Sequence, residues 1–334
     1  MRTRNLLAFA AATLVLAACS NDEEAVVNSN FPEDGVIRVA TNVDSPATRA
    51  GMTTGALTSF YLDITNGENA TSYSYFVEMK KETDVWNAYD KETLTTMLWQ
   101  NNSTPIKVTA AYLNGHAFTE DKLTGTTPTA LAVAADQSAA EGAGIAANDL
   151  LGMPTTTINP SKADDPNLVD GKLKVTLKHT LAKLKLIVKL GTEFNATTAG
   201  TGTNPISDVA INGTKLNYTY SGPDMKIALP ETTDNNAAAV TPYTVSYKAG
   251  ESTTKNAVAI YECILVPQTV EADNFSVSMK INEVDYVWTS AATVEMGSGI
   301  EYALVLTAGK EILTVSKLAA YAWGNGTGSN IATE

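Results

Sequence analysis

Apolar and polar residues alternate along most of this chain, which is the pattern of half-buried β-strands. In residues 275–281 (FSVSMKI) every second side chain is apolar, and the others are serine or lysine. The next apolar run follows so closely that we predict a hairpin turning at Asn282 and Glu283. Similar alternation, bounded by Gly, Asn, Asp or Pro, occurs in LTSFYLDIT, YSYFVEMKKE, PIKVTAAYL and YALVLTAG.

Helical patterning is rare in this sequence, and its best example, residues 129–144, is weak. Many short strands separated by turn residues favour antiparallel β-sandwiches over a parallel α/β sheet. The chain has 334 residues, enough for two domains. We therefore predict an all-β protein with two antiparallel β-sandwich domains in tandem.

The long apolar strand at residues 172–190 changes phase along its length. Its odd-numbered positions are apolar at first, with His179 on the same face, whereas from Leu184 onward the even-numbered positions are apolar. A slip of one residue exchanges the two faces of a strand, so we expect a bulge or bend within residues 180–183. Such a bend lets one strand serve two packing environments.

A Gly-, Thr- and Asn-rich stretch, residues 191–204, follows this strand and reads as a linker or long surface loop. We place the domain boundary at its start. The sequence thus predicts an N-terminal domain at 50–190 and a C-terminal domain at 191–334.

The first 18 residues are predicted to be a lipoprotein signal peptide. Two arginines precede an apolar run that is too short to span a bilayer, and the run ends in Leu-Ala-Ala-Cys at Cys19. This lipobox predicts lipidation of Cys19, including palmitate, and cleavage by the lipoprotein signal peptidase. An ordinary secretory peptide with a chance cysteine is the alternative. The chain from Cys19 onward would then begin as an acidic, lipidated tether, and the precursor would be an outer-membrane lipoprotein.

The second of the two cysteines, Cys263, lies in the apolar run AIYECILVP. With Cys19 used for the lipid, no intramolecular disulfide is expected. A lone cysteine in an apolar strand is most often a small core residue. A catalytic thiol would need a nearby histidine and an electropositive setting, and His116 and His179 occur in unrelated contexts.

The formal net charge of -13 argues against nucleic-acid binding, because that affinity comes largely from neutralising phosphates. No catalytic or nucleotide-binding motif occurs in the sequence, so we expect no enzyme, no cofactor and no metal. Asp164, Asp165 and Asp170 could bind calcium, although their spacing departs from the known acidic loop and a solvated surface loop is favoured. The four tryptophans could stack on sugars, but core packing is their ordinary role.

Arginine is confined to the start of the chain: Arg49, in the stretch SPATRAGM, is the last one. Lysine supplies the basic side chains after it, apart from two histidines. A planar guanidinium and a compact ammonium are recognised differently, so an arginine-specific enzyme finds no target after Arg49.

Two segments resemble the fimbrillins, the type V pilins of Bacteroidales. The run VTLKHTLAKLKLIV is similar to the strand motif H-x-L-A-K-L of that family. The stretch GSGIEYALVLTAGKEILTVSKLAAYAW resembles the family's ending, G-x-x-Y-x-L-x-L followed by an I-x-V-x strand and a final Trp. With the lipobox and the arginine in PATRAG, the similarity spans nearly the whole chain.

The resemblance implies two domains of transthyretin-like topology, secretion as a lipoprotein, and assembly after cleavage by an arginine-specific protease. Arg49 matches the processing arginine of the family, which makes residues 19–49 a lipidated tether with a removable propeptide strand and Ala50 the first mature residue. Partners would be other copies of this chain or related pilins, and the mature protein would lie in a fimbrium at the cell surface, with a role in adhesion.

The strand pattern is compatible with polymerisation by strand addition. Residues 36–43 (VIRVATNV) alternate, so before cleavage they can fill a place in the first domain's sheet. Residues 311–334 are the candidate donor strand that would fill this place from a neighbour. On one predicted face of that strand lie the candidate anchors Leu313, Val315, Tyr321 and Trp323.

Other functions stay open at this point. A tip or accessory adhesin, or a glycan-binding lipoprotein of the same fold, could lack a working donor strand. An anchor subunit would keep its lipid and lack the processing arginine. A polysaccharide-degrading enzyme should show paired carboxylates in a cleft.

Overall fold

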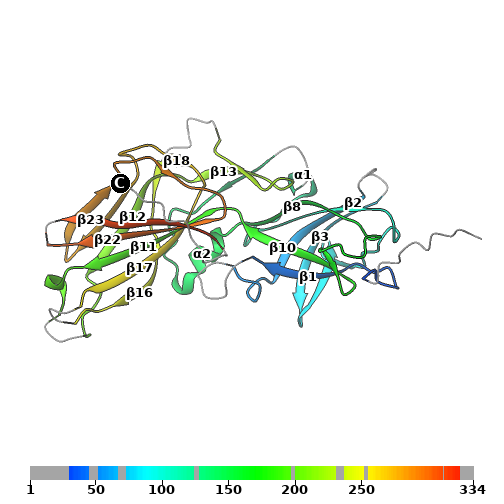
Figure 1. The fold of residues 1–334 in the computed structure, drawn as a ribbon, viewed down its shortest axis with the longest axis horizontal. Coiled ribbons are helices and arrows are strands. Elements are labelled where there is room, and N and C mark those ends of the chain that lie inside the picture. Colours follow the sequence, from blue (N-terminus) through cyan, green and yellow to red (C-terminus); the bar gives the residue numbers. More distant parts are fainter. Residues whose placement is uncertain are drawn as a thin grey trace, which may run out of the picture.

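The computed structural model describes residues 30–44, 52–66, 73–123, 128–196, 200–230, 237–251, 255–310 and 312–323. In these ranges the protein is nearly all β, as predicted, and its strands gather in two halves of an elongated molecule (Figure 1). The α-helices there are short: α1 covers Glu120–Leu123 and α2 covers Ala143–Asn148. No helix in the described ranges is long and apolar enough to span a bilayer.

The N-terminal half is built on one sheet with the strand order β1-β10-β8-β6-β2-β3-β4-β5, and β9 pairs with β10. Alternate side chains of these strands enclose one apolar core, as the period of two requires. The β1–β10 pairing is parallel, and the others in this sheet are antiparallel. The bounds are β1 Arg38–Val43, β2 Ser59–Asn66, β3 Ser74–Glu82, β4 Val85–Asp90, β5 Thr93–Thr95, β6 Ile106–Tyr112, β8 Leu151–Ile158, β9 Leu168–Val169 and β10 Lys172–His179.

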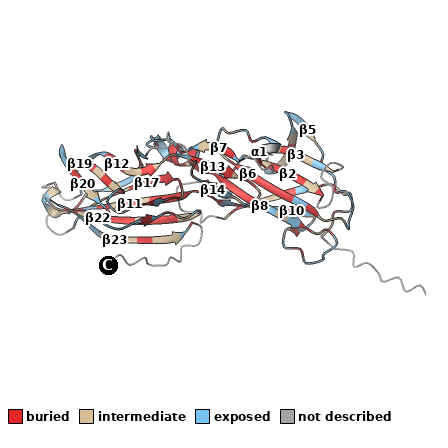
Figure 2. Cartoon of the chain, turned by 90° about the horizontal axis from the view of Figure 1, so that it is seen from above, coloured by how far each residue is buried: buried red, intermediate tan, exposed pale blue. Residues whose placement is uncertain are grey.

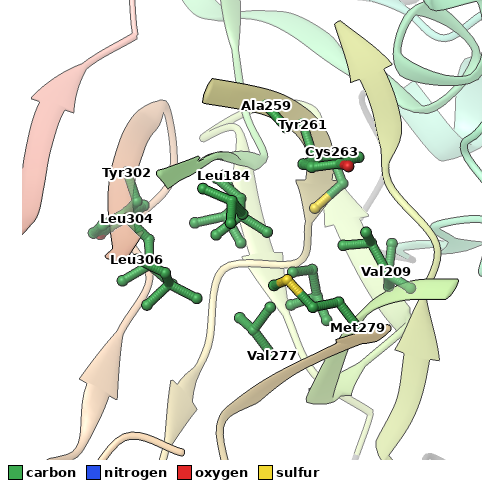
Figure 3. Close-up of a cluster of buried hydrophobic side chains, with 14 of the residues drawn as sticks. Leu184, Val209, Ala259, Tyr261, Cys263, Val277, Met279, Tyr302, Leu304 and Leu306 are labelled. Atoms are coloured by element: carbon green, nitrogen blue, oxygen red, sulfur yellow. The ribbon is translucent and has the colours of Figure 1, made fainter. Parts of the chain in front are cut away.

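The C-terminal half contains a five-stranded sheet, β16-β17-β11-β22-β23, and a four-stranded sheet, β15-β12-β19-β20. Apolar side chains from both sheets form the second core, part of which is shown in Figure 3. The bounds are β11 Ala182–Leu190, β12 Ile206–Lys215, β15 Ala237–Val240, β16 Tyr243–Lys248, β17 Ala257–Leu265, β19 Ser276–Ile281, β20 Val284–Thr289, β22 Ile300–Ala308 and β23 Leu313–Ala322, with β18 Thr269–Val270 paired to β21 Val294–Glu295.

A third apolar cluster joins the two halves. Strand β7, Thr129–Ala132, pairs with β13, Asn217–Ser221, and β13 pairs with β14, Lys226–Ala228. Tyr218 and Tyr220 of β13 are buried in this cluster together with side chains from the N-terminal half. Since both halves contribute to one packed cluster, side chains at this junction contact both halves.

The predicted bend in the long apolar strand is confirmed. Strand β10 ends at His179 in the N-terminal sheet, and β11 begins at Ala182 in the C-terminal sheet, between β17 and β22. The sheets therefore divide the chain at the bend, whereas we predicted the boundary after Leu190. The phase change marks the passage between two cores, and the glycine-rich stretch that we took for a linker follows β11 within the C-terminal half.

Two local predictions are confirmed. Strands β19 and β20 form the hairpin, and its two turn residues, Asn282 and Glu283, have φ angles of 49° and 65°. Positive φ at both central residues is the conformation whose twist suits a two-residue hairpin. Cys263 is a buried core residue on β17, and burial raises the pKa of its thiol, which keeps it protonated. Within the weak helical window, only α2 is an α-helix, and it starts near the window's end.

One buried carboxyl gives the N-terminal half a pH-dependent stability. Asp63 on β2 is buried, and its Oδ1 atom makes no hydrogen bond within the described ranges. Burial, and then the negative charge of Glu120, raise the pKa of Asp63 to about 7. Because the unfolded carboxyl titrates near pH 4, folding is penalised progressively between about pH 4 and 7, and fully above that.

The substitution Asp63→Asn should therefore stabilise the protein at pH 8, by roughly 2–4 kcal/mol, and have little effect at pH 4. Melting temperatures measured across this pH range check the prediction. Asp90→Asn, at an exposed position on β4, is the matched control and should not change the pH profile. A lower melting temperature of Asp63→Asn at pH 8 would contradict the assignment.

Candidate functional site

Strand β1 occupies one edge of the N-terminal sheet. It pairs with β10 in parallel register, from Arg38 opposite Lys172 to Val43 opposite Leu177. The side chains of Ile37, Val39 and Val43 are buried in the core. Of residues 36–43, which were expected to fill a place in this sheet, 38–43 do so as β1, whereas Val36 bridges Leu98. Departure of this segment would break the ladder with β10 and two backbone hydrogen bonds, from Ile37 to Met97 and from Trp99 to Gly35. It would expose the backbone of β10 and three core positions.

A cavity of about 520 Å³ lies beside β1. One wall is β1 itself, and the other is formed by β4, β5 and the residues after β5. Its apolar lining includes Ile37, Val39, Met79, Trp86, Leu94 and Met97. Polar side chains, among them Asp84, Asn87 and Lys172, complete the lining. Because β1 is one of its walls, loss of this strand would open the cavity into a partly apolar groove.

Strand β23 occupies an edge of the five-stranded sheet in the other half (Figure 2). It pairs antiparallel with β22 along its whole length. The register shifts once: Val315 lies opposite Leu306, whereas Lys317 lies opposite Val305. The candidate donor strand is therefore held in its own subunit by a single neighbouring strand.

This register shift overturns the prediction that all four anchors share one face. A bulge adds one residue to β23 and reverses the alternation after it. Leu313 and Val315 therefore face the C-terminal core side of the sheet, and Tyr321 and Trp323 face the other side. In the sequence the odd-numbered apolar set of residues 313–323 is interrupted only at Lys317. This single interruption did not by itself indicate a bulge, which forms against a pairing partner.

The four anchors differ in burial. Trp323 is buried and packs in the apolar cluster between the halves, whereas Val315 is 42% exposed. Leu313 packs partly against the C-terminal core, and Tyr321 is half-buried. Of the four anchors, only Trp323, which directly follows β23, is buried.

The indole of Trp323 lies flat on the imidazole of His179, with ring centroids 3.8 Å apart and planes 6° apart. The Nδ1 atom of His179 lies 2.8 Å from the Oδ1 atom of Asp149. A backbone hydrogen bond of 2.7 Å, from Trp323 to the carbonyl oxygen of Gly299, fixes the strand end. His179 was expected to be a satisfied core histidine, and the structure gives its Nδ1 atom a carboxylate partner.

A buried ammonium lies on the same side of the sheet. The Nζ atom of Lys183 is 2.8 Å from an oxygen of Glu262 and 3.8 Å from an oxygen of Glu301. It also lies 5.9 Å from the centre of the Trp323 ring, within the range of a cation–π contact. Trp323 thus contacts ionisable groups from β10 and β11, and the ammonium of Lys183 is in turn paired with carboxylates from β17 and β22.

The sequence analysis missed Asp149, Lys183, Glu262 and Glu301. Three of them carried a signal, because each is a charged residue inside an otherwise apolar strand. Charged side chains are rarely buried unless they are paired, so three such positions in strands of one sheet predict a buried polar cluster.

Exposed apolar side chains in the described ranges gather in two places. Nine large apolar residues are exposed there, and seven of them fall into two groups. The first group lies by the β1 cavity, and the second lies around the β20 and β23 edges, where it borders a cavity of about 330 Å³. The first group consists of Val85, Leu94 and Leu98. The second consists of Val284, Val287, Ile312 and Val315, and the remaining two residues, Val169 and Val245, lie apart from both groups. Gathered apolar side chains at a surface mark interaction sites more often than scattered ones do.

Three predicted site residues, Cys19, Arg49 and Ala50, lie outside the described residues. Arg38 is described: it belongs to β1 and forms an ion pair with Asp34, and this hydrogen-bonded guanidinium lowers the pKa of Asp34 to about 2.

In the acidic loop that was considered for calcium, the carboxylate of Asp165 stabilises the loop's own backbone. Both oxygens of Asp165 accept backbone N–H groups, from Asn159 and Asn167. Asp164 lies 3.6 Å from the ammonium of Lys162. Within the described ranges, no three His, Cys, Asp or Glu side chains come together as metal ligands.

Comparison with known proteins decides the family. The profile of the fimbrillin-like family matches residues 47–320. The chain belongs to the fimbrillin-like family. This membership supports a fimbrial subunit at the cell surface, and the family consists of structural proteins rather than enzymes. No curated protein matches the sequence.

Among the solved structures similar to this chain in fold are two from Bacteroides species. One, from Bacteroides ovatus ATCC 8483, is described as a "putative cell adhesion protein"; it is 14% identical, with a TM-score of 0.59 over 86% of this chain and 97% of the other. The second, from Bacteroides uniformis ATCC 8492, carries the same description and is 14% identical, with a TM-score of 0.53 over 87% of this chain and 99% of the other. At this identity the likeness establishes the fold.

Proposed function

We propose that this chain is a polymerising subunit of a surface fimbria, with a role in adhesion. In this proposal it is exported as a lipoprotein, cleaved after Arg49, and joined to its neighbours by donation of β23. The observation that carries the proposal is the place of β1: the strand that cleavage would release is an edge strand, and a partly apolar cavity lies beside it.

Release of β1 would leave an unpaired sheet edge to which another strand can bind. The vacated edge of β10 would present unpaired N–H and C=O groups, next to the core positions of Ile37, Val39 and Val43. An open edge with an apolar groove aggregates unless a strand fills it. A strand supplied by a neighbouring copy completes both the ladder and the core.

Strand β23 is suited to be this donor because it too is an edge strand. It can leave β22 without breaking any other ladder of its sheet. Its bulge belongs to the pairing with β22, so a regular strand in a new partner would return Leu313, Val315, Tyr321 and Trp323 to one face.

The two exposed apolar groups support contact between copies. One group borders the proposed acceptor site, and the other lies at the base of the proposed donor strand. They occur on different halves of the molecule, so a contact between them joins unlike surfaces, head to tail. Repetition of a head-to-tail contact whose rotation does not close a ring produces a filament.

A tip or accessory subunit of the same fold is the second candidate. The observation that favours it is the burial of Trp323 within its own subunit. A strand that remains paired in its own subunit cannot be donated to a neighbour, and so cannot extend a filament. Cleavage of purified proprotein by an arginine-specific protease separates the two, because only the polymerising subunit should then form filaments.

The lipoprotein part of the proposal predicts the effect of Cys19→Ser. The variant has no thiol for the lipid, so labelling with a radioactive fatty acid should be abolished, and the precursor should be soluble or unprocessed. Cys263→Ser, at the other cysteine, is the control and should be labelled like the wild type. Equal membrane association of Cys19→Ser and wild type would contradict the lipoprotein assignment.

A further inference from the structure

A continuous line of contacts runs from β1 to the end of β23. The N–H of Val43, the last residue of β1, donates to the hydroxyl of Thr54 over 2.8 Å. Two residues earlier in the same segment, the N–H of Met52 donates to the Oδ2 atom of Asp149 over 2.7 Å. Met52 is the third residue after Arg49 in the sequence. The segment just after the proposed cleavage point is therefore tied both to β1 and to Asp149.

Asp149 uses its two oxygens for two different partners. Oδ2 accepts the N–H of Met52, and Oδ1 lies 2.8 Å from Nδ1 of His179. The side chains of Asp149 and His179 are both fully buried. Because a carboxylate only accepts hydrogen bonds, this contact places a proton on Nδ1 and fixes the orientation of the imidazole. The imidazole in turn is the flat surface on which Trp323 lies.

The contact between His179 and Trp323 is suited to release. The Nε2 atom of His179 and the Nε1 atom of Trp323 are both buried, and neither makes a hydrogen bond within the described ranges. Each would gain a water partner if Trp323 left. Lys183, Glu262 and Glu301 lie beside the stack, and buried ionic groups of this kind add less stability than a well-packed apolar contact.

We infer that Asp149, His179 and Trp323 form a latch, which holds β23 on its own subunit until cleavage after Arg49 loosens it. This inference rests on the proposed function. Cleavage cuts the chain between β1 and Met52, and departure of β1 removes the hydrogen bond from Val43 to Thr54. The Met52 segment then moves more freely, Asp149 loses one partner, and the imidazole under Trp323 loses its fixed orientation.

The coupling has to act in both directions. If loss of β1 favours release of Trp323, release of Trp323 favours loosening of the segment around Met52 to the same extent. The polar contacts and the ring stack supply the physical connection between the two sites. Positioning residues such as Asp149 would then prevent assembly before processing.

Amide hydrogen exchange of the full-length monomer, measured by mass spectrometry, tests the latch without requiring filaments. Asp149→Asn keeps the shape of the side chain but cannot accept both the Met52 and the His179 protons. Peptides covering 313–323 should exchange about tenfold faster in this variant than in wild type. Asp165→Asn is the matched control: its carboxylate is also buried and accepts two backbone N–H groups, away from β23.

A second variant covers the case in which Asp149→Asn does not fold. Thr54 is exposed, so Thr54→Val should fold and removes the acceptor for the N–H of Val43. It should speed exchange in peptides covering 313–323 by a smaller factor. Unchanged exchange of β23 in Thr54→Val and in cleaved wild-type protein would overturn the latch.

The latch and the proposed function fail in different ways. If cleavage of wild-type protein speeds exchange of β23 but no filament grows, strand donation is wrong and the latch stands. If cleaved protein forms filaments while Asp149→Asn exchanges as slowly as Asp165→Asn, the latch is wrong and strand donation stands.

Discussion

Deletion of residues 311–334 will abolish polymerisation and leave a folded, cleavable subunit. The deletion removes β23, which is hydrogen-bonded only to β22 within the described sheet. The strands β16, β17, β11 and β22 keep their pairings, and the four-stranded sheet still covers the core. The expected product is a monomer on gel filtration, before and after protease treatment.

The truncated subunit will also be less stable. Trp323 and Ala319 are buried in the intact chain, and removing a buried tryptophan costs roughly 3–5 kcal/mol. A drop in melting temperature alone therefore does not distinguish a donor strand from an internal one. Normal filaments from the truncated protein would rule out the donor role.

A cysteine pair separates donation from stability. Ala303 on β22 and Ala319 on β23 lie directly opposite each other in the ladder. Cross-strand partners are about 4.5–5.5 Å apart between Cα atoms, within the range that a disulfide spans. In Ala303→Cys/Ala319→Cys, the oxidised and cleaved protein should stay monomeric, and reduction should restore polymerisation. Each sample thus serves as its own control, and filaments from the oxidised form would contradict donation of β23.

The substitution Arg49→Ala will give an elongated proprotein that stays monomeric. Without this arginine the protease has no site between β1 and Met52, so β1 keeps its place beside β10. Wild-type protein from cells should begin at Ala50. N-terminal sequencing and gel filtration of both proteins measure this, and mature wild-type protein that begins well beyond Ala50 would contradict the assignment.

Arg38→Ala is the matched control for this experiment. Arg38 lies within β1, and its backbone is paired with β10, whereas a protease binds its substrate as an unpaired, extended chain. We expect Arg38→Ala to be processed after Arg49 and to polymerise like wild type. Its loss of the ion pair with exposed Asp34 should have little effect on stability.

The sequence predicted those parts of the fold that depend on local alternation. The hairpin at Asn282 and Glu283, the burial of Ile37, Val39 and Val43, and the bend after His179 all follow from the period of two. Family membership likewise followed from motifs that are contiguous in the chain.

Features that depend on pairing between distant segments could not be predicted in this way. The bulge in β23 exists only against β22, and it separates Val315 from Tyr321. The stack of Trp323 on His179 joins residues far apart in sequence, and neither residue type indicates the other. Composition marked the loop after β11, whereas the change of sheet occurs before β11 and depends on pairing with β17 and β22.

Cleavage of the purified proprotein by an arginine-specific protease tests the central claim most directly. We predict that wild-type protein, once cut after Arg49, forms filaments visible by electron microscopy and ladders on gels run without boiling. The same treatment of Arg49→Ala should give neither. A wild-type protein that is cut after Arg49, loses β1 and remains a monomer would contradict the account.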